Sequence, residues 1–184
     1  PEGLHKWVCP GPIGGNNGST TYSYHPDKKL LFVPVIESCM SLAKEGSEMV
    51  PGNPSFGGSL GDSDATAKTA YGHLTAIDPV TGKIHWRYRD NFPMVGGALS
   101  TAGNLVFTGN QQGWALALDT DTGEVLWKFQ TGSGVRSQPV SYEIDGRQYV
   151  AIGSGTGGLA MQVVGQPEIV TYGSALIVFA LPQD

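Results

Sequence analysis

The sequence is poor in charge and has no long apolar run. Only 15% of its residues are charged, and the net charge at pH 7 is −5. No run of about 18 apolar residues occurs, so we expect no membrane span. Basic patches with interleaved aromatic residues are also missing, and the acidic balance disfavours nucleic acid as a partner. The chain begins at Pro1 without a visible signal peptide, so either processing removed its start or it is a piece of something larger.

Helical periodicity is missing as well, whereas glycine is abundant. The chain contains 27 glycines and 12 prolines, and 40% of its residues are hydrophobic. The glycines follow no three-residue period, which excludes a collagen-like chain. This composition predicts an all-β fold of many short strands joined by tight turns.

Cysteine occurs only twice, as Cys9 and Cys39. Neither has a second cysteine or a histidine pair at zinc-site spacing. The two are either buried free thiols or one disulfide that closes a loop across a strand pair. We favour the disulfide, which implies an oxidising compartment.

A repeat is the strongest signal in the sequence. The segment Gly72–Trp86 returns as Gly113–Trp127, with a constant offset of 41 residues. A period in the forties with strand–turn–strand content is typical of propeller blades. The chain would contain roughly four such units. Four is the lowest number of blades in known propellers, so we expect an incomplete ring.

Each part of the repeat has a physical role. Ala76 is small enough for a close approach between sheets, Asp78 caps the amides of a hairpin turn, and Gly82 takes a positive φ. Ile84 and Trp86 are predicted to alternate inward on the returning strand. The indole of Trp86 would bury against the neighbouring blade and donate to a carbonyl, as would that of its counterpart Trp127. We interpret both as structural.

Other strands fit around the repeat, and one long stretch does not. The stretch 43–70 is rich in Gly, Ser, Asp and Pro without alternation, and is predicted as a loop excursion. Its Asp62 and Asp64 lack the rest of a calcium-loop series, which favours a solvated loop. The further predicted strands are 29–35, 104–109, 148–153 and 175–181.

Several segments resemble, in order, those of the pyrroloquinoline quinone (PQQ)-dependent alcohol dehydrogenases of the methanol and ethanol type. The repeat is similar to the tryptophan-docking repeat of these quinoproteins. The resemblance covers nearly the whole chain outside 43–70, but only the C-terminal third or so of such an enzyme. It implies blades of four antiparallel strands in an incomplete part of an eight-bladed ring, and a Cys9–Cys39 disulfide. The segments are Val8–Pro10, Gly14–Asn17, Tyr22–Pro26, Leu31–Pro34, Cys39–Met40, Gly97–Gly109 and Trp127–Gly134.

The resemblance places four residues near the quinone. Asn17 occupies the position of an asparagine that contacts the quinone in the family; otherwise it is a turn residue beside Gly18. Val95 stands where methanol dehydrogenases have a tryptophan that touches the cofactor, so that contact is lost or remade. Gly158 matches a glycine whose backbone approaches the quinone, unless its glycine pair is only a turn. Leu159 follows it, where some members have tryptophan.

The function that the resemblance implies is oxidation of a small alcohol to an aldehyde or ketone by PQQ beside a calcium or lanthanide ion. In the family the metal ligands, the catalytic Asp, the vicinal disulfide and the tryptophan under the quinone lie upstream, so no catalytic or metal-binding residue is assigned here. The implied partners are the remaining blades, in another chain or a missing N-terminal portion, and a cytochrome or similar electron acceptor. We expect a periplasmic or secreted protein.

The alternative is a cofactor-free propeller that serves as a scaffold for protein partners. The segment around Asn17 and the cysteine pair favours the dehydrogenase, because a scaffold has no need of it. Val95 and Leu159 favour the scaffold mildly. Surface or structural roles are predicted for the four histidines, because none lies in a triad or metal pattern: they are His5, His25, His73 and His85.

Overall fold

The chain is built from short antiparallel strands. The computed structural model describes residues 6–11, 14–16, 20–44, 50–52, 58–63, 70–155 and 173–180. These ranges contain no helix with the length and hydropathy needed to cross a membrane. Of the residues predicted near the quinone, Asn17, Gly158 and Leu159 lie outside the described ranges.

Two sheets have the four-stranded form predicted for a blade. In each, the strands are ordered from the innermost to the outermost, as β2-β3-β6-β7 and β8-β9-β10-β11. Both carry a register irregularity at the same point of the repeat, between Ala76 and Ile77 and between Ala117 and Leu118. The strands are β2 (Ser23–His25), β3 (Leu30–Glu37), β6 (Tyr71–Ile77), β7 (Ile84–Asp90), β8 (Leu99–Ser100), β9 (Leu105–Gly109), β10 (Trp114–Asp119) and β11 (Val125–Gln130).

Two further sheets have three strands within the described residues. One, ordered β12-β13-β14, follows the second blade, and the other, ordered β1-β4-β5, is appended near the N-terminus. Strand β5 lies inside the 43–70 stretch that the sequence predicts as a loop excursion, and it pairs with β4. The strands are β12 (Val140–Ile144), β13 (Arg147–Gly155), β14 (Ser174–Ala180), β1 (Lys6–Val8), β4 (Met40–Ala43) and β5 (Ser59–Ser63).

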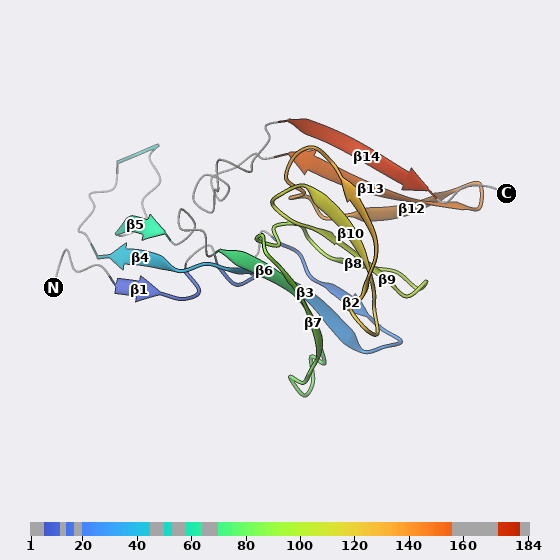
Figure 1. The fold of residues 1–184 in the computed structure, drawn as a ribbon, viewed down its shortest axis with the longest axis horizontal. Helices are drawn as coiled ribbons and strands as arrows, with labels where there is room; N and C mark the ends of the chain where they lie inside the picture. Colours follow the sequence, from blue (N-terminus) through green and yellow to red (C-terminus); the bar gives the residue numbers. More distant parts are fainter. Residues whose placement is uncertain are drawn as a thin grey trace.

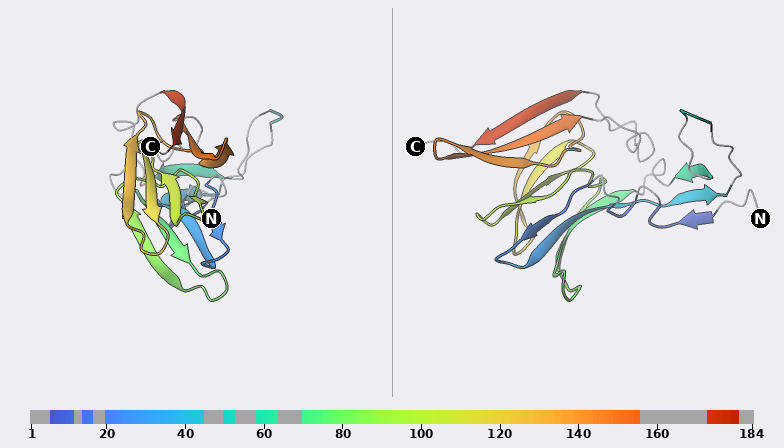
Figure 2. Two further views of the ribbon diagram at one scale, coloured as in Figure 1. Left: turned by 90° about the vertical axis from the view of Figure 1, so that its right-hand side faces the viewer. Right: turned by 180° about the vertical axis from the view of Figure 1, so that it is seen from behind.

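The three blade sheets stand side by side. Figure 1 shows the β8–β11 sheet between the β2-β3-β6-β7 sheet and the β12–β14 sheet, while the β1-β4-β5 sheet projects toward the N-terminal end. The views in Figure 2 show the same fan of blades from the side and from behind. This stacking is how propeller blades bury their faces against neighbours.

The core lies in the two layers between blades. On β3, burial alternates residue by residue along the whole strand, so every second side chain faces the next blade. The first layer joins Leu30, Phe32, Leu74 and Ala76 to Ala98, Val106, Leu116 and Leu118, with Met94 among them. The second layer joins Ala115, Val135, Val150 and Ile152.

The hairpin roles predicted for the repeat are confirmed. Asp78 Oδ1 accepts from the amides of Val80 and Thr81 at 2.8 and 3.2 Å, and Gly82 has a φ of 74°. The pKa of the Asp78 carboxyl is lowered most by a hydrogen bond from the Thr81 side chain, and further by these two backbone hydrogen bonds. The prediction that Ile84 faces inward is wrong: the residue is 46% exposed at the start of β7, and burial increases only farther along the strand, at Trp86, Tyr88 and Asp90.

The docking of the repeat tryptophan is confirmed for Trp86. Its indole Nε1 donates to the carbonyl of Thr120 at 2.9 Å, in the next blade. Its ring packs where Gly123 has no side chain, since a Cβ there would lie 2.6 Å from Trp86 Cε3. Trp127 packs edge-on against Phe179 of the third blade, with ring centroids 4.8 Å apart.

Candidate functional site

The stretches that lead into the innermost strand of each blade come together at one edge of the blades. We call them the lead-in segments: residues 20–22 before β2, 93–98 before β8 and 134–139 before β12. The amide of Ala98 donates to the carbonyl of Thr21 at 2.9 Å, and the amide of Gly97 donates to the carbonyl of Ser137 at 3.3 Å. Backbone hydrogen bonds therefore join three consecutive blades along this edge.

Glycine permits this approach. A Cβ on Gly96 would lie 2.8 Å from the amide nitrogen of Gly109, and a Cβ on Gly97 would overlap the Thr21 hydroxyl. A Cβ on Gly109 would overlap the side chain of Val135. The glycines of the Gly97–Gly109 stretch, which carry part of the family resemblance, thus have a packing reason of their own.

Val95 lies in the second lead-in segment, but only 4% of its surface is exposed. Little of its side chain is therefore available to a ligand. Its neighbours on either side, Met94 and Gly96, are buried as well. Contact between Val95 and a cofactor stays a prediction.

The described neighbours of the other predicted residues approach the same edge. Asn16, which precedes Asn17, donates its side-chain amide to the carbonyls of Thr20 at 2.9 Å and Pro34 at 3.0 Å. At the end of β13, the amide of Gly155 donates to the carbonyl of Gly134 at 2.8 Å. The chain thus reaches the lead-in segments just before Asn17 and just before the Gly158 pair, while those residues themselves are outside the described ranges.

The Cys9–Cys39 disulfide is present, with the two Cα atoms 4.4 Å apart. Cys39 lies between β3 and β4, where the chain passes from the first blade into the appended sheet. Beside it, the amide of Gly11 donates to the carbonyl of Ser38 at 2.7 Å. The disulfide therefore ties the N-terminal segment to the end of β3.

The described histidines are not arranged as a metal or triad site. His85 is exposed, as predicted, whereas His25 is buried and its ring nitrogens have no hydrogen-bond partner. His73 is buried between Glu37 Oε1 at 3.1 Å and Thr75 Oγ1 at 2.8 Å. Burial lowers its pKa below 6.5, with the hydrogen bond to Glu37 opposing the shift. Among the residues that the structure describes, no three His, Cys, Asp or Glu side chains form a metal-binding group.

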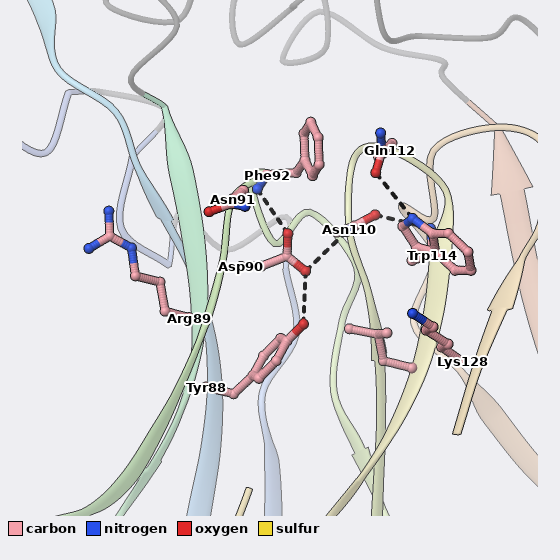
Figure 3. Close-up of a pocket in the computed structure, with 10 residues that line it drawn as sticks. Tyr88, Arg89, Asp90, Asn91, Phe92, Asn110, Gln112, Trp114 and Lys128 are labelled. Atoms are coloured by element: carbon pink, nitrogen blue, oxygen red, sulfur yellow. Dashed lines mark hydrogen bonds between the residues drawn. The ribbon is translucent and has the colours of Figure 1, made fainter. Parts of the chain in front are cut away.

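A buried polar cluster beside the lead-in segments was missed by the sequence analysis. It lines a pocket of about 240 Å³ between the first two blades, shown in Figure 3. Asp90, at the end of β7, accepts hydrogen bonds from the Tyr88 hydroxyl at 3.2 Å, the Phe92 amide at 2.9 Å and the Asn110 side chain at 3.1 Å. The repeat gave an indication of this cluster: the residue 41 positions after Asp90 is Thr131, so the two repeats do not share the carboxylate.

The pocket keeps its tyrosine protonated. Burial, followed by the charge of Asp90 and the hydrogen bond to it, raises the pKa of Tyr88 far above its usual value. Tyr88 is therefore a hydrogen-bond donor to Asp90 across the physiological pH range. On the other side of the pocket, Lys128 Nζ lies 5.1 Å from the ring centre of Trp114, whose Nε1 donates to Gln112 Oε1 at 3.1 Å.

Comparison with known proteins identifies relatives along the whole chain. A family profile described as the glucose/ethanol/alcohol dehydrogenase, β-propeller domain (PQQ) matches residues 63–150. Quinoprotein alcohol dehydrogenase PedH of Pseudomonas putida is 38% identical over 188 aligned positions, which cover 100% of this chain and 31% of that protein. Quinoprotein ethanol dehydrogenase of Pseudomonas aeruginosa is 36% identical over 185 positions, covering 95% of this chain and 28% of that protein.

A solved structure agrees with these relatives. Europium-containing methanol dehydrogenase matches with a TM-score of 0.86 at 29% identity, over 98% of this chain and 36% of that one. The predicted all-β propeller fold is thereby confirmed. The chain spans about 30% of the length of the curated relatives it matches.

Proposed function

Because this chain is homologous along its whole length to one part of the quinoprotein alcohol dehydrogenases, we propose that it belongs to a PQQ-dependent enzyme that oxidises an alcohol to an aldehyde or ketone. The observation that carries the proposal is the similarity to PedH over 100% of the chain at 38% identity. The chain would contribute three blades and the edge formed by the lead-in segments, and the remaining blades would come from the rest of the protein.

The role we propose for this chain is to form part of the wall around the quinone. Asn17 would donate its amide to the rim of the ring, and the backbone at Gly158 and Leu159 would approach the ring closely. Beside Asn16, the Thr20 hydroxyl has no hydrogen-bond partner, but its residue is only 1% exposed and, like Val95, offers little surface to a ligand. When bound, the quinone supplies the two-electron oxidation chemistry, while the protein binds and orients it and excludes water.

The calcium or lanthanide ion of the family does not fit the described residues, which lack a cluster of ligands. We propose that the ligands of the metal lie elsewhere in the protein. A cytochrome or similar acceptor would take the electrons. The disulfide supports a periplasmic or secreted location, because disulfides persist in oxidising compartments.

The experiment is an assay of the natively purified full-length protein. Alcohol-dependent reduction of an artificial dye is measured before PQQ removal, after it, and after PQQ is added back. Activity that falls and returns with PQQ supports the proposal. A protein that holds no quinone and reduces no dye would point to a cofactor-free scaffold instead.

A matched pair of variants tests the wall. Asn17→Ala should weaken PQQ retention, because it removes the amide donor, while Val80→Ala should not, because Val80 is 91% exposed in the turn at the opposite edge of the first blade. Equal PQQ retention in both variants would show that Asn17 does not contact the quinone.

A further inference from the structure

Asn110 makes hydrogen bonds through both its side chain and its backbone. Its residue is 1% exposed and follows β9 directly. Its side chain donates through Nδ2 to Asp90 Oδ2 at 3.1 Å and accepts through Oδ1 from the amide of Trp114 at 3.0 Å. Its backbone amide donates to the carbonyl of Trp114 at 3.1 Å, and its carbonyl accepts from the amides of Gly113 at 3.2 Å and Val135 at 3.0 Å.

These bonds join three consecutive blades at one residue. Asp90 ends the outermost strand of the first blade, Trp114 begins β10 in the second, and Val135 lies in the segment that leads into the third. Figure 3 shows the Asp90 carboxylate directed at Asn110, with the Tyr88 hydroxyl below it. Asn110 therefore sets the spacing between the blades next to the lead-in segments.

The second carboxylate oxygen of Asp90 accepts a hydrogen bond at the start of the second lead-in segment. Its Oδ1 accepts from the amide of Phe92, and the next carbonyl along the chain, that of Pro93, accepts from the amide of Gln111 at 3.0 Å. Farther on, the Gly96 amide donates to the carbonyl of Gly109 at 3.0 Å. The stretch that carries Val95 is thus held at its start by Asp90 and along its length by the chain around Asn110.

A buried charge is more than blade packing needs at this position. In the next repeat the same position is Thr131, whose hydroxyl takes part in neutral hydrogen bonds with the carbonyls of Gly113 and Ser133. Burying a carboxylate is costly unless donors surround it, and here three donors do. Of the two repeats, only the one that leads to Val95 has a buried carboxylate at this position.

We propose that Asp90 and Asn110 are positioning residues for the edge that faces the quinone. The inference rests on the proposed function, because its effect is measured as PQQ affinity. The positioning itself rests on the hydrogen bonds described above. The pair fixes the second and third lead-in segments in one arrangement, so that the residues carried by the edge meet the ligand without rearranging. Such pre-arrangement is how residues without ligand contact affect binding.

The test exchanges the two side chains in the full-length protein. Asn110→Asp sets two carboxylates against each other at the present distance of 3.1 Å, and Asp90→Asn leaves two amides there. Each single variant should bind added PQQ about tenfold more weakly. The double variant Asp90→Asn/Asn110→Asp restores one amide opposite one carboxylate and should recover most of the affinity.

A pH profile separates positioning from general loss of structure. In Asn110→Asp the affinity for PQQ should improve as the pH is lowered and one of the paired carboxylates takes up a proton. The other ionisable groups around this pocket are Tyr88 and Arg89 on β7 and Lys128 on β11. Burial and the charge of Asp90 raise the pKa of Tyr88, so the tyrosine stays protonated in that range. The parent and Asn110→Ala should lack this improvement.

The control is Gln112→Ala, which removes a side chain of the same pocket that bonds Trp114 Nε1 and not the lead-in segments. Amide hydrogen exchange at Gly96, Gly97 and Val135 gives a readout without quinone, and should be faster in the single variants only. A parent that binds no PQQ would sink the proposed function. Unchanged exchange and affinity in the single variants, or a double variant as weak as they are, would overturn the positioning role.

Discussion

Gly123 is the point at which the second blade receives the tryptophan of the first. It has a φ of 74°, and its missing Cβ leaves room for the ring of Trp86. Two separate restraints therefore act on one residue, a left-handed backbone and a close neighbour. Gly146, in the β12–β13 turn, has a φ of 76° but nothing within 4 Å of its missing Cβ.

Replacing each glycine with alanine separates the two restraints. Gly146→Ala should lower the free energy of unfolding by about 1 kcal/mol, the cost of a left-handed Cβ. Gly123→Ala should cost a further 1–3 kcal/mol or so, because the added methyl displaces Trp86. Chemical denaturation of both variants measures the difference. If the two losses are equal, the Trp86 ring adjusts freely and is not docked.

His73 gives the protein a specific pH dependence. Its folded pKa lies below the value of 6.5 that it has in the unfolded chain, so the unfolded state takes up the proton first. The stabilisation that the neutral, buried His73 gives to the folded state is fully present above about pH 6.5. It is lost as the pH falls from there toward the folded pKa. His73→Gln should therefore flatten the fall in the free energy of unfolding over that window. Denaturation curves at several pH values test this, and parallel losses in parent and variant would contradict it.

At the scale of single residues, the sequence predicts a residue's role where that role is local or occurs in both repeats. Asp78 and Trp86 were identified because the repeat displays their spacing, and the structure confirms both. The burial of Ile84 was predicted wrongly, because alternation shows which side chains share a face and not where along the strand the neighbouring blade covers that face. Asn110 could not be identified from the sequence, because its partner Asp90 lies 20 residues away and has no counterpart in the next repeat.

At the scale of elements, the disulfide closes the end of the β1–β4 ladder, where the chain passes from the first blade into the appended sheet. Cys39 stands between β3 of the first blade and β4 of the appended sheet, and Cys9 follows β1 directly. The segment between them is further fixed by the pair of hydrogen bonds between Gly15 and Ile36, at 2.7 and 3.0 Å. The appended sheet is thereby anchored to a blade at its base.

Removing the disulfide should destabilise the protein, but the blades should still fold. The variant Cys9→Ser/Cys39→Ser frees a loop whose ends are 30 residues apart, for which the chain-entropy model gives about 3–4 kcal/mol. The melting temperature should drop, and reductant should reproduce the drop in the parent but not in the variant. A parent that is indifferent to reductant while its thiols become titratable would refute this.

The strands of the repeat could be predicted because alternation and turn residues repeat within them. The predicted strands 104–109 and 148–153 correspond to β9 and β13, and 29–35 corresponds to β3. Strand β5 could not be predicted, because the stretch around it lacks alternation, and only its pairing with β4 defines it as a strand. The residues proposed at the quinone came from resemblance alone, since no local pattern marks them.

At the scale of the whole molecule, the chain presents an uncovered apolar face on its third blade. Val140 and Val178 stand on either side of Ala151 in register, so they lie in one row across the sheet. Val178 is 47% exposed and Leu176 73%. The corresponding faces of the first two blades are covered by the next blade, as the two core layers show.

In the full-length protein this face should be covered by another blade. Val178→Lys should then lower the melting temperature substantially, because it places a charge in a buried layer. Val80→Lys, at a position 91% exposed, is the control and should leave it unchanged. Thermal denaturation of both variants is the measurement. If Val178→Lys is as harmless as the control, the face is open to solvent in the whole protein.

Gly82 has the same φ of 74° as Gly123, yet nothing lies within 4 Å of its missing Cβ. The first blade therefore offers a vacant place of the kind that receives Trp86 in the second, while the third blade offers a bare apolar sheet at the opposite end. None of the four tryptophans lies in β12, β13 or β14, so the third blade of a second copy has no indole ring to place against Gly82. The two ends therefore do not complement each other as consecutive blades do, and head-to-tail growth of copies of residues 1–184 is not expected.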